Sequence, residues 1–347
     1  KCYEKAGLIF LTAIEQKYKK REVRYNNLLQ KQEKADRFIS NLRLAVFLAG
    51  IGAAIIMYMA HNFVLFTAVL ILFAAAFIYL VVRHEKLINS IKYVTVLRDI
   101  NTCSLKRLKG EWNTFADDGR DFMDSSHSYS EDLDIFGKNS LFQWINTANT
   151  FIGRRRLSEL FSGVIGNSDD IRNRQEAVSE LAKMLSWRQR FLAEGMLKKG
   201  EMCDPRKLIR WARESSEFFR NFWVIFIIRV CPIITLILVV TGLVMNKVSW
   251  YLPVAALIAQ FALLSYKIKE RYRMFSIAEN YADDLKVYYK MIKLFEKQRF
   301  KSPHIKKIKK EIKDKNGLEV FKQVDKLSSI IDAIADRRNF FYVFINI

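Results

Sequence analysis

The chain has 347 residues, of which 51% are hydrophobic and 27% are charged, and its formal net charge is +21. The hydrophobic share exceeds that of an ordinary soluble domain, so the apolar residues must be segregated from the charged ones. The positive charge does not by itself indicate a nucleic-acid partner, because the cytoplasmic segments of membrane proteins are rich in lysine and arginine.

Residues 1–41 predict a charged, amphipathic, cytoplasmic helix, and residues 42–83 predict a first transmembrane hairpin. Each of the apolar runs 42–59 and 63–82 is long enough to cross a bilayer core of about 30 Å. A two-residue turn at 61–62 joins the runs. The runs lack the polar face that helices in a soluble core show, so we favour membrane insertion over a buried hairpin.

Residues 218–266 predict a second hairpin, with spans at 230–245 and 250–266 and a turn at 246–249. Arg229 lies just before the first of these spans, and a charge at mid-bilayer costs at least about 2.5 kcal/mol. We expect its guanidinium to reach the cytoplasmic headgroups. The alternative is an intramembrane ion or lipid site.

Lysine and arginine gather on the outer flanks of both hairpins. The turn at 61–62 contains neither, and the turn at 246–249 contains only Lys247. Basic flanks stay on the cytoplasmic side of a membrane. We therefore expect a multi-pass protein of the inner (cytoplasmic) membrane with four spans and both termini in the cytoplasm.

Residues 84–126 predict a linking helix, at about 85–112, and the start of a polar, acidic loop that extends to 139. Residues 127–217 then predict packed helices. Ser140 and Thr150 are candidate N-caps, with the helix broken and restarted near 149–153 and ended by two glycines, Gly163 and Gly166.

The next helix is predicted to be capped by Asp169 and Asp170. Its expected apolar stripe consists of Ile171, Ala177, Val178, Leu181 and Leu185. In the preceding helix, the arginines at 154–156 are interpreted as a solvated or ion-paired face, and the alternative is a phosphate-binding role.

No catalytic or metal-binding pattern is present. The four cysteines form no CxxC pair, and the four histidines form no HxxxH or HExxH spacing, so we expect free, reduced thiols and no zinc site. Ser126 and His127 lie near Asp124 and Asp132, the residue types of a hydrolase triad. Such triads depend on a rigid scaffold, so helix capping is the better interpretation of this local, polar stretch.

Spaced elements in residues 127–181 resemble the opening of the core domain of the MutS mismatch-repair family. The matching residues are His127, Asp132, Asp134, Gly137, Ser140, Thr150, Gly153, Arg154 and Arg174. The family usually has proline after the threonine, where this chain has Phe151. The resemblance implies an all-α fold, a helical MutS-like core or lever domain, here combined with two transmembrane hairpins.

The resemblance also implies a C-terminal ATPase domain, but the chain contains no GxxxxGK[ST] phosphate loop. Its last helix resembles the one that leads into that ATPase, so we expect a fragment. The chain itself is then not an enzyme and has no cofactor, with ATP and Mg²⁺ expected only for the missing domain. Dimerisation is expected to depend on that domain too.

Two features bear on DNA. No phenylalanine begins the Phe-x-Glu motif with which the family reads mismatches, so mismatch recognition is not expected. The return helices, at 267–347, contain four clustered lysines that are candidates for contact with anionic lipid or with nucleic acid. These are Lys306, Lys307, Lys309 and Lys310.

The leading hypothesis is a membrane-anchored MutS-like core module that couples the missing ATPase domain to the membrane or to a partner. The first alternative is a DNA-binding repair or recombination protein tethered to the membrane. The second is an integral-membrane scaffold.

Overall fold

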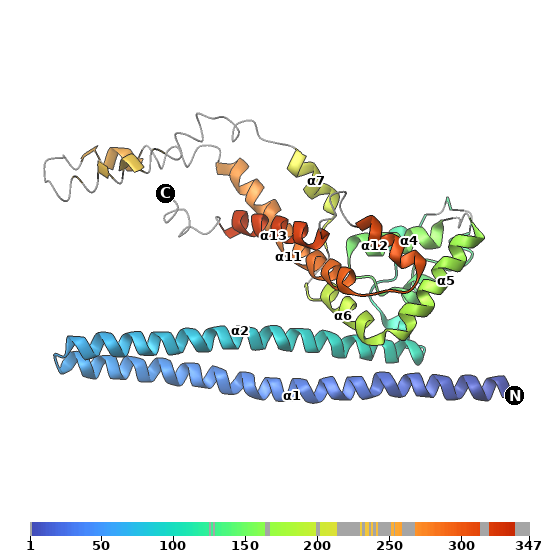
Figure 1. Cartoon of the computed structure of the whole chain (residues 1–347), viewed down its shortest axis with the longest axis horizontal. Coiled ribbons are helices and arrows are strands. Elements are labelled where there is room, and N and C mark those ends of the chain that lie inside the picture. The colour runs from blue at the N-terminus through green and yellow to red at the C-terminus, as the bar shows by residue number, and fades with distance from the viewer. Residues whose placement is uncertain are drawn as a thin grey trace. The chain divides into compact units, whose positions relative to one another are not determined.

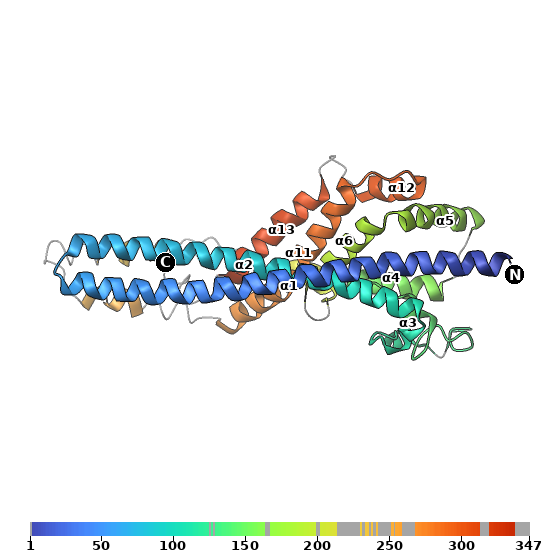
Figure 2. The same ribbon diagram turned by 90° about the horizontal axis from the view of Figure 1, so that it is seen from below.

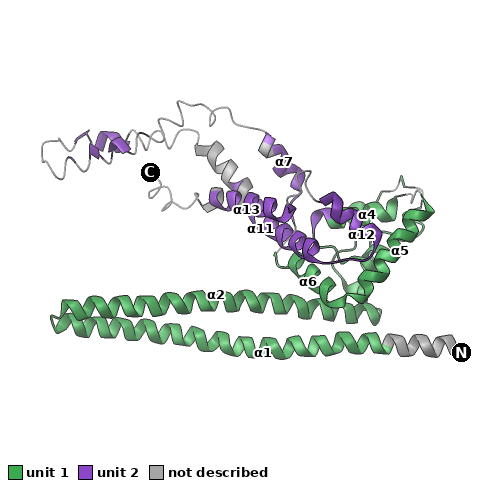
Figure 3. Ribbon diagram, in the orientation of Figure 1, with its two compact units in different colours: residues 1–149, 153–199 green, residues 150–152, 200–347 purple. Residues whose placement is uncertain are grey.

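The computed structural model describes residues 2–124, 126–127, 129–163, 167–198, 202–213, 268–312 and 319–336, with isolated residues and short pieces between 230 and 258. These ranges are helical and contain no strand, which confirms the all-α prediction for them. The chain divides into two compact units, residues 1–149 with 153–199, and residues 150–152 with 200–347 (Figure 3). Most of the second predicted hairpin, Arg229 included, lies outside the described residues.

The first unit is dominated by two long helices, α1 (Cys2–Met59) and α2 (Phe63–Leu108), which lie side by side and antiparallel (Figures 1 and 2). The predicted cytoplasmic helix and first span are therefore one helix, because no glycine or proline lies near their junction at residues 41–42. Likewise α2 joins the second span to the linking helix, which ends at Leu108 rather than Trp112.

The predicted turn at 61–62 is confirmed. His61 adopts the left-handed conformation, with φ of 53°. The side chain of Asn62 then accepts a hydrogen bond of 3.2 Å from the backbone N–H of Leu65 and so caps α2.

The apolar halves of α1 and α2 expose their side chains. Leu80 is the one buried residue of the apolar runs 42–59 and 63–82, whereas Val64 and Ile71, for example, are 78% and 67% exposed. Two helices cannot bury an apolar surface all round, whereas a bilayer can cover it. By length and composition, the structure thus has two helices able to cross a membrane.

Smaller helices follow α2 in the first unit. They are the 3₁₀ helices η1 (Glu111–Thr114) and η2 (Arg120–Phe122), then α3 (Leu141–Ile145), α4 (Phe151–Ser162), α5 (Ser168–Lys183) and α6 (Leu185–Met196). The first two residues of α4 are assigned to the second unit. The helix α6 packs on α2 through Leu97, Ile100 and Ala193.

Two predictions about α5 are wrong. Its N-cap is Asn167, whose side chain accepts from the backbone N–H of Asp169, while the two aspartates occupy the first turn and favour the helix dipole from there. The predicted apolar stripe is also not a buried face. Ala177 is buried, but Ile171 and Val178 are 40% and 65% exposed, because α5 contacts little beyond its neighbour α6.

The second unit contains four described helices, α7 (Pro205–Arg213), α11 (Ile268–Lys297), α12 (Pro303–Ile312) and α13 (Val320–Asp336). Its core joins Leu208 of α7, Tyr281 of α11 and Ile331 of α13.

The sequence of the last helix predicts an apolar stripe of Leu327, Ile330, Ile331 and Ile334, and this prediction is only partly correct. Ile331 is buried, but Leu327 and Ile330 are exposed. The buried face of α13 instead runs through Phe321, Ser328 and Ile331, at the i, i+7, i+10 spacing of one helix face.

Candidate functional site

The segment between α2 and α4 folds over one phenylalanine. Phe142 is fully buried, and the ring centroids of Phe122, Phe136 and Phe161 lie 5.7, 5.6 and 6.3 Å from its own. The prediction of a polar, acidic loop that extends to 139 is therefore incomplete, because Phe122 and Phe136 of this loop pack in an apolar cluster. Its aromatic residues form a small core, which the high content of aspartate and serine hid from a reading by composition.

Glycine is required at position 119. Its φ is +71°, and a Cβ atom there would lie 2.6 Å from Cδ1 of Phe142. Any larger residue would displace the ring of Phe142. The buried position of this ring therefore depends on a glycine at position 119.

Several of the motif residues between 127 and 174 shape this loop. Asp134 and Gly137 adopt positive φ angles of 46° and 98°, and the backbone N–H of Gly137 donates to the carbonyl of Asp118 at 2.8 Å. Ser140 is the N-cap of α3, as predicted, and accepts from the backbone N–H of Gln143 at 3.2 Å. These residues act through the backbone and through capping.

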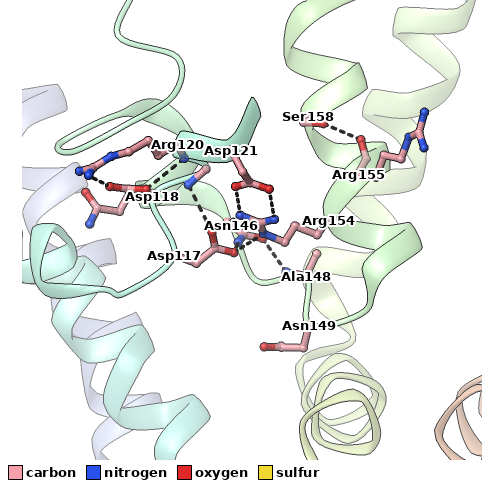
Figure 4. Close-up of polar contacts among 12 residues, drawn as sticks. Asp117, Asp118, Arg120, Asp121, Asn146, Ala148, Asn149, Arg154, Arg155 and Ser158 are labelled. Carbon is pink, nitrogen blue, oxygen red and sulfur yellow. Dashed lines mark hydrogen bonds and ion pairs between the residues drawn. The ribbon is translucent and has the colours of Figure 1, made fainter. Parts of the chain in front are cut away.

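Arg154 of α4 binds two carboxylates of the loop (Figure 4). Its Nε and Nη2 donate to the two oxygens of Asp117, both at 2.7 Å, and its Nη1 donates to Asp121 at 2.6 Å. The guanidinium also lies over the ring of Phe122, 4.6 Å from its centroid. The hydrogen bonds to Asp117 and Asp121 raise the pKa of Arg154, and Arg154 in turn lowers the pKa of the Asp121 carboxyl.

The next two arginines are ion-paired as well. Arg155 and Arg156 both bind Glu159, at 3.2 and 2.9 Å. The face formed by 154–156 is thus ion-paired, as the first of the two interpretations predicts, and its donors already have carboxylate partners where a phosphate would have to bind.

A second basic residue attaches the loop to α2. Arg107, in the last turn of α2, donates to the backbone carbonyls of Trp144 and Asn146 at 2.9 and 2.6 Å. Burial lowers the pKa of this guanidinium. The end of the long hairpin is therefore joined directly to α3 and to the loop that holds Arg154.

The residues that suggest a hydrolase triad do not form one. Ser126 donates to the carboxylate of Asp124 at 2.6 Å, while Nε2 of His127 lies 2.8 Å from the carbonyl of Ser162, the last residue of α4. Because a carbonyl only accepts, Nε2 must donate. His127 therefore caps the C-terminus of α4, in agreement with the capping interpretation.

The remaining motif residues lie apart from this core. Asp132 is exposed in the loop, Thr150 directly precedes α4, Gly153 lies within α4, and Arg174 is half-buried on α5. The structure thus brings Gly137, Ser140 and Arg154 to one cluster but not the whole motif.

The four predicted lysines lie on the short helix α12. Lys306, Lys307 and Lys310 are exposed, and Ile305 on the opposite side is buried. Lys309 instead donates to the backbone carbonyl of Gln298 at 2.7 Å and so holds the turn before α12. Three of the four are therefore open to an external partner.

A further basic group was missed from the sequence. Lys17, Lys20 and Arg21 of α1 line a cleft together with Lys183 and Arg190, which follow more than 160 residues later. The spacing i, i+3, i+4 on α1 was the available signal, but lysine and arginine there served only to orient the hairpin.

Comparisons with known proteins assign no family. No protein-family model, no curated protein and no solved structure matches the chain. Within the described residues, no group of three histidine, cysteine, aspartate or glutamate side chains could hold a metal ion. The function is therefore argued from the residues of the chain itself.

Proposed function

We propose that the chain is a membrane-anchored helical module whose first hairpin crosses the bilayer and couples it to a folded cytoplasmic part. The observation that carries this proposal is the unbroken course of α1 and α2. Each helix has an apolar stretch that is exposed except at Leu80, and each continues without interruption into a polar half that contacts other helices.

Polar contacts between α1 and α2 keep the two helices in register outside the apolar stretch. Gln32 donates to Ser90 at 2.7 Å, and Thr102 donates to Glu22 at 2.8 Å. Hydrogen bonds at two positions along the hairpin oppose sliding of α1 along α2, so the two helices can transmit a movement as one rigid element.

A third contact marks the edge of the apolar stretch. A guanidinium nitrogen of Arg43 lies 3.1 Å from Nδ1 of His84, and Nε2 of His84 lies 3.1 Å from a carboxylate oxygen of Asp36. Arginine only donates, so Nδ1 of His84 accepts. These polar neighbours of Arg43 lie where the proposed span begins, at the position at which a charge can still reach the headgroups.

We further propose that residues 127–217 form a core module related to that of the MutS family, which would couple a C-terminal ATPase to the membrane or to a partner. The order of the motif residues supports this, as do the cap at Ser140 and the restart of the helix at Phe151. The second hairpin, at 218–266, belongs to the same proposal.

The topology can be tested by thiol labelling. In a chain whose native cysteines are replaced by serine, Ala60→Cys is expected to react with a membrane-impermeant thiol reagent in intact cells, because it lies at the outer turn. Lys31→Cys, which is equally exposed but on the cytoplasmic half of α1, is the matched control. It should react only after the cells are permeabilised, and its labelling in intact cells would overturn the proposed orientation.

The partner of the α12 lysines can be tested by hydrogen exchange. Residues 303–312 are expected to be more protected when the protein is in nanodiscs containing phosphatidylglycerol than in phosphatidylcholine, since each lysine near an anionic surface contributes about 1 kcal/mol. The double change Lys306→Glu and Lys307→Glu should abolish this difference, while Lys297→Glu with Lys326→Glu, two exposed lysines outside α12, should preserve it.

The same variants decide the DNA alternative. If the protein in phosphatidylcholine nanodiscs binds duplex DNA, with a steep salt dependence that only the change at Lys306 and Lys307 removes, α12 binds nucleic acid rather than lipid.

A further inference from the structure

A basic cleft of about 610 Å³ lies in the first unit, lined by the polar half of α1 and by the junction between α5 and α6. Five cationic side chains line it, and no acidic side chain does. They are Lys17, Lys20, Arg21, Lys183 and Arg190.

These charges are not compensated within the part of the chain that the structure describes. No ion pair involves Lys17, Lys20, Lys183 or Arg190 there. Because the fold brings these cations together without a neutralising acid, the cleft has a positive electrostatic potential, which favours binding of an anion.

The arginine of the cleft is held by a buried polar relay. Nη1 of Arg21 donates to Oε1 of Gln189 at 2.8 Å, and Nη2 donates to Ser186 at 2.5 Å. Gln189 in turn donates to Asn101 at 2.8 Å, and both amides are buried. Arg21 is thus oriented before any ligand arrives, which lowers the entropic cost of binding.

The wall of the cleft includes the first turn of α6. Its N-cap, Met184, offers no side-chain hydrogen bond to the turn, and Leu185, Ser186 and Trp187 line the cleft. The last turn of α5, with Lys183, lines the same wall, so the negative end of the α5 dipole opposes the positive end of the α6 dipole there, and the field of the cleft comes from its five side chains.

The position of the cleft along α1 separates it from the bilayer. Arg21 precedes the apolar stretch, which begins at position 42, by enough residues to place it about 30 Å away along the helix. Headgroups of the membrane that holds the hairpin cannot span that distance, so the cleft faces solutes of the aqueous phase. This step rests on the proposed anchoring, whereas the lining of the cleft does not.

We propose that this cleft binds a soluble oligophosphate, the class of anion that includes the polyphosphate group of a nucleotide. Its volume lies in the range of small-molecule sites, about 300–1,000 Å³. Lysine ammonium groups and an oriented guanidinium are the side chains that bind phosphate oxygens. Several such groups around one cleft match a ligand that carries several negative charges.

The test is calorimetric titration of the full chain in phosphatidylcholine nanodiscs with inorganic tripolyphosphate, at about 150 mM salt to screen diffuse attraction. Saturable binding at one site per chain is expected. The variant Lys17→Gln with Lys20→Gln should weaken it at least about tenfold, or 1.4 kcal/mol. Both lysines are exposed, so their loss should leave the fold intact.

The matched control is Lys31→Gln with Lys34→Gln, which removes the same charge from exposed positions on α1 outside the cleft. It should change the affinity less than about twofold, because surface charges at this distance are screened. Absence of saturable binding, or an equal loss in both variants, would overturn the proposal. Binding of duplex DNA in preference to tripolyphosphate, lost with Lys17 and Lys20, would assign the cleft to nucleic acid and overturn it too.

Discussion

Replacing Phe142 by alanine is expected to destabilise the loop between α2 and α4 by about 3–5 kcal/mol, the usual cost of removing a buried phenylalanine. Phe142 is fully buried, and the rings of Phe122, Phe136 and Phe161 pack around it. The cavity left behind would be lined by these rings, and the loop has few other apolar contacts with which to fill it.

Hydrogen exchange of the full chain measures this effect locally. The backbone N–H groups of Gly137 and Leu141, which donate across the loop, should lose protection in Phe142→Ala. Leu133→Ala is the control, because Leu133 lies in the same loop and is exposed. Unchanged protection in the phenylalanine variant would show that the loop does not depend on this core.

Replacing Asn101 by leucine is expected to cost about 2–3 kcal/mol, because it leaves the buried side-chain NH2 group of Gln189 without its acceptor. Asn101 donates to the carbonyl of Leu97 at 2.6 Å and accepts from Gln189 at 2.8 Å, and this pair joins α2 to α6. Thermal unfolding and the exchange of α6 amides measure the loss. Asn27→Leu, an exposed position on α1, is the control and should change stability by less than about 0.5 kcal/mol.

A double variant separates an unsatisfied polar group from a packing defect. Asn101→Leu with Gln189→Leu removes both amides, and it should recover much of the stability lost in the single variant, because no buried polar atom remains unpaired between α2 and α6. If the double variant is as unstable as the sum of the two single variants, the amide pair is not what joins α2 to α6. Arg21 loses one partner in the double variant, so tripolyphosphate binding should weaken even where the stability recovers.

The local pattern of the sequence was enough to predict the helices and several of their ends. The apolar runs around His61 and Asn62 predicted a hairpin, and the hydroxyl of Ser140 predicted the start of α3, because composition and capping act within a few residues of the chain. The sequence predicted separate helices where α1 and α2 are each continuous. A change from charged to apolar residues moves a helix from water into an apolar environment, but it does not end the helix.

The sequence by itself determined that this protein is helical, basic and divided between apolar and charged stretches. Only the tertiary structure decided which carboxylates pair with Arg154, that Asn101 and Gln189 meet, and that Lys17 shares a cleft with Lys183. The physical reason is that hydropathy and capping are properties of neighbouring residues, whereas these contacts join residues between 37 and more than 160 positions apart. Their partners are selected by packing of the helices, which no local pattern encodes.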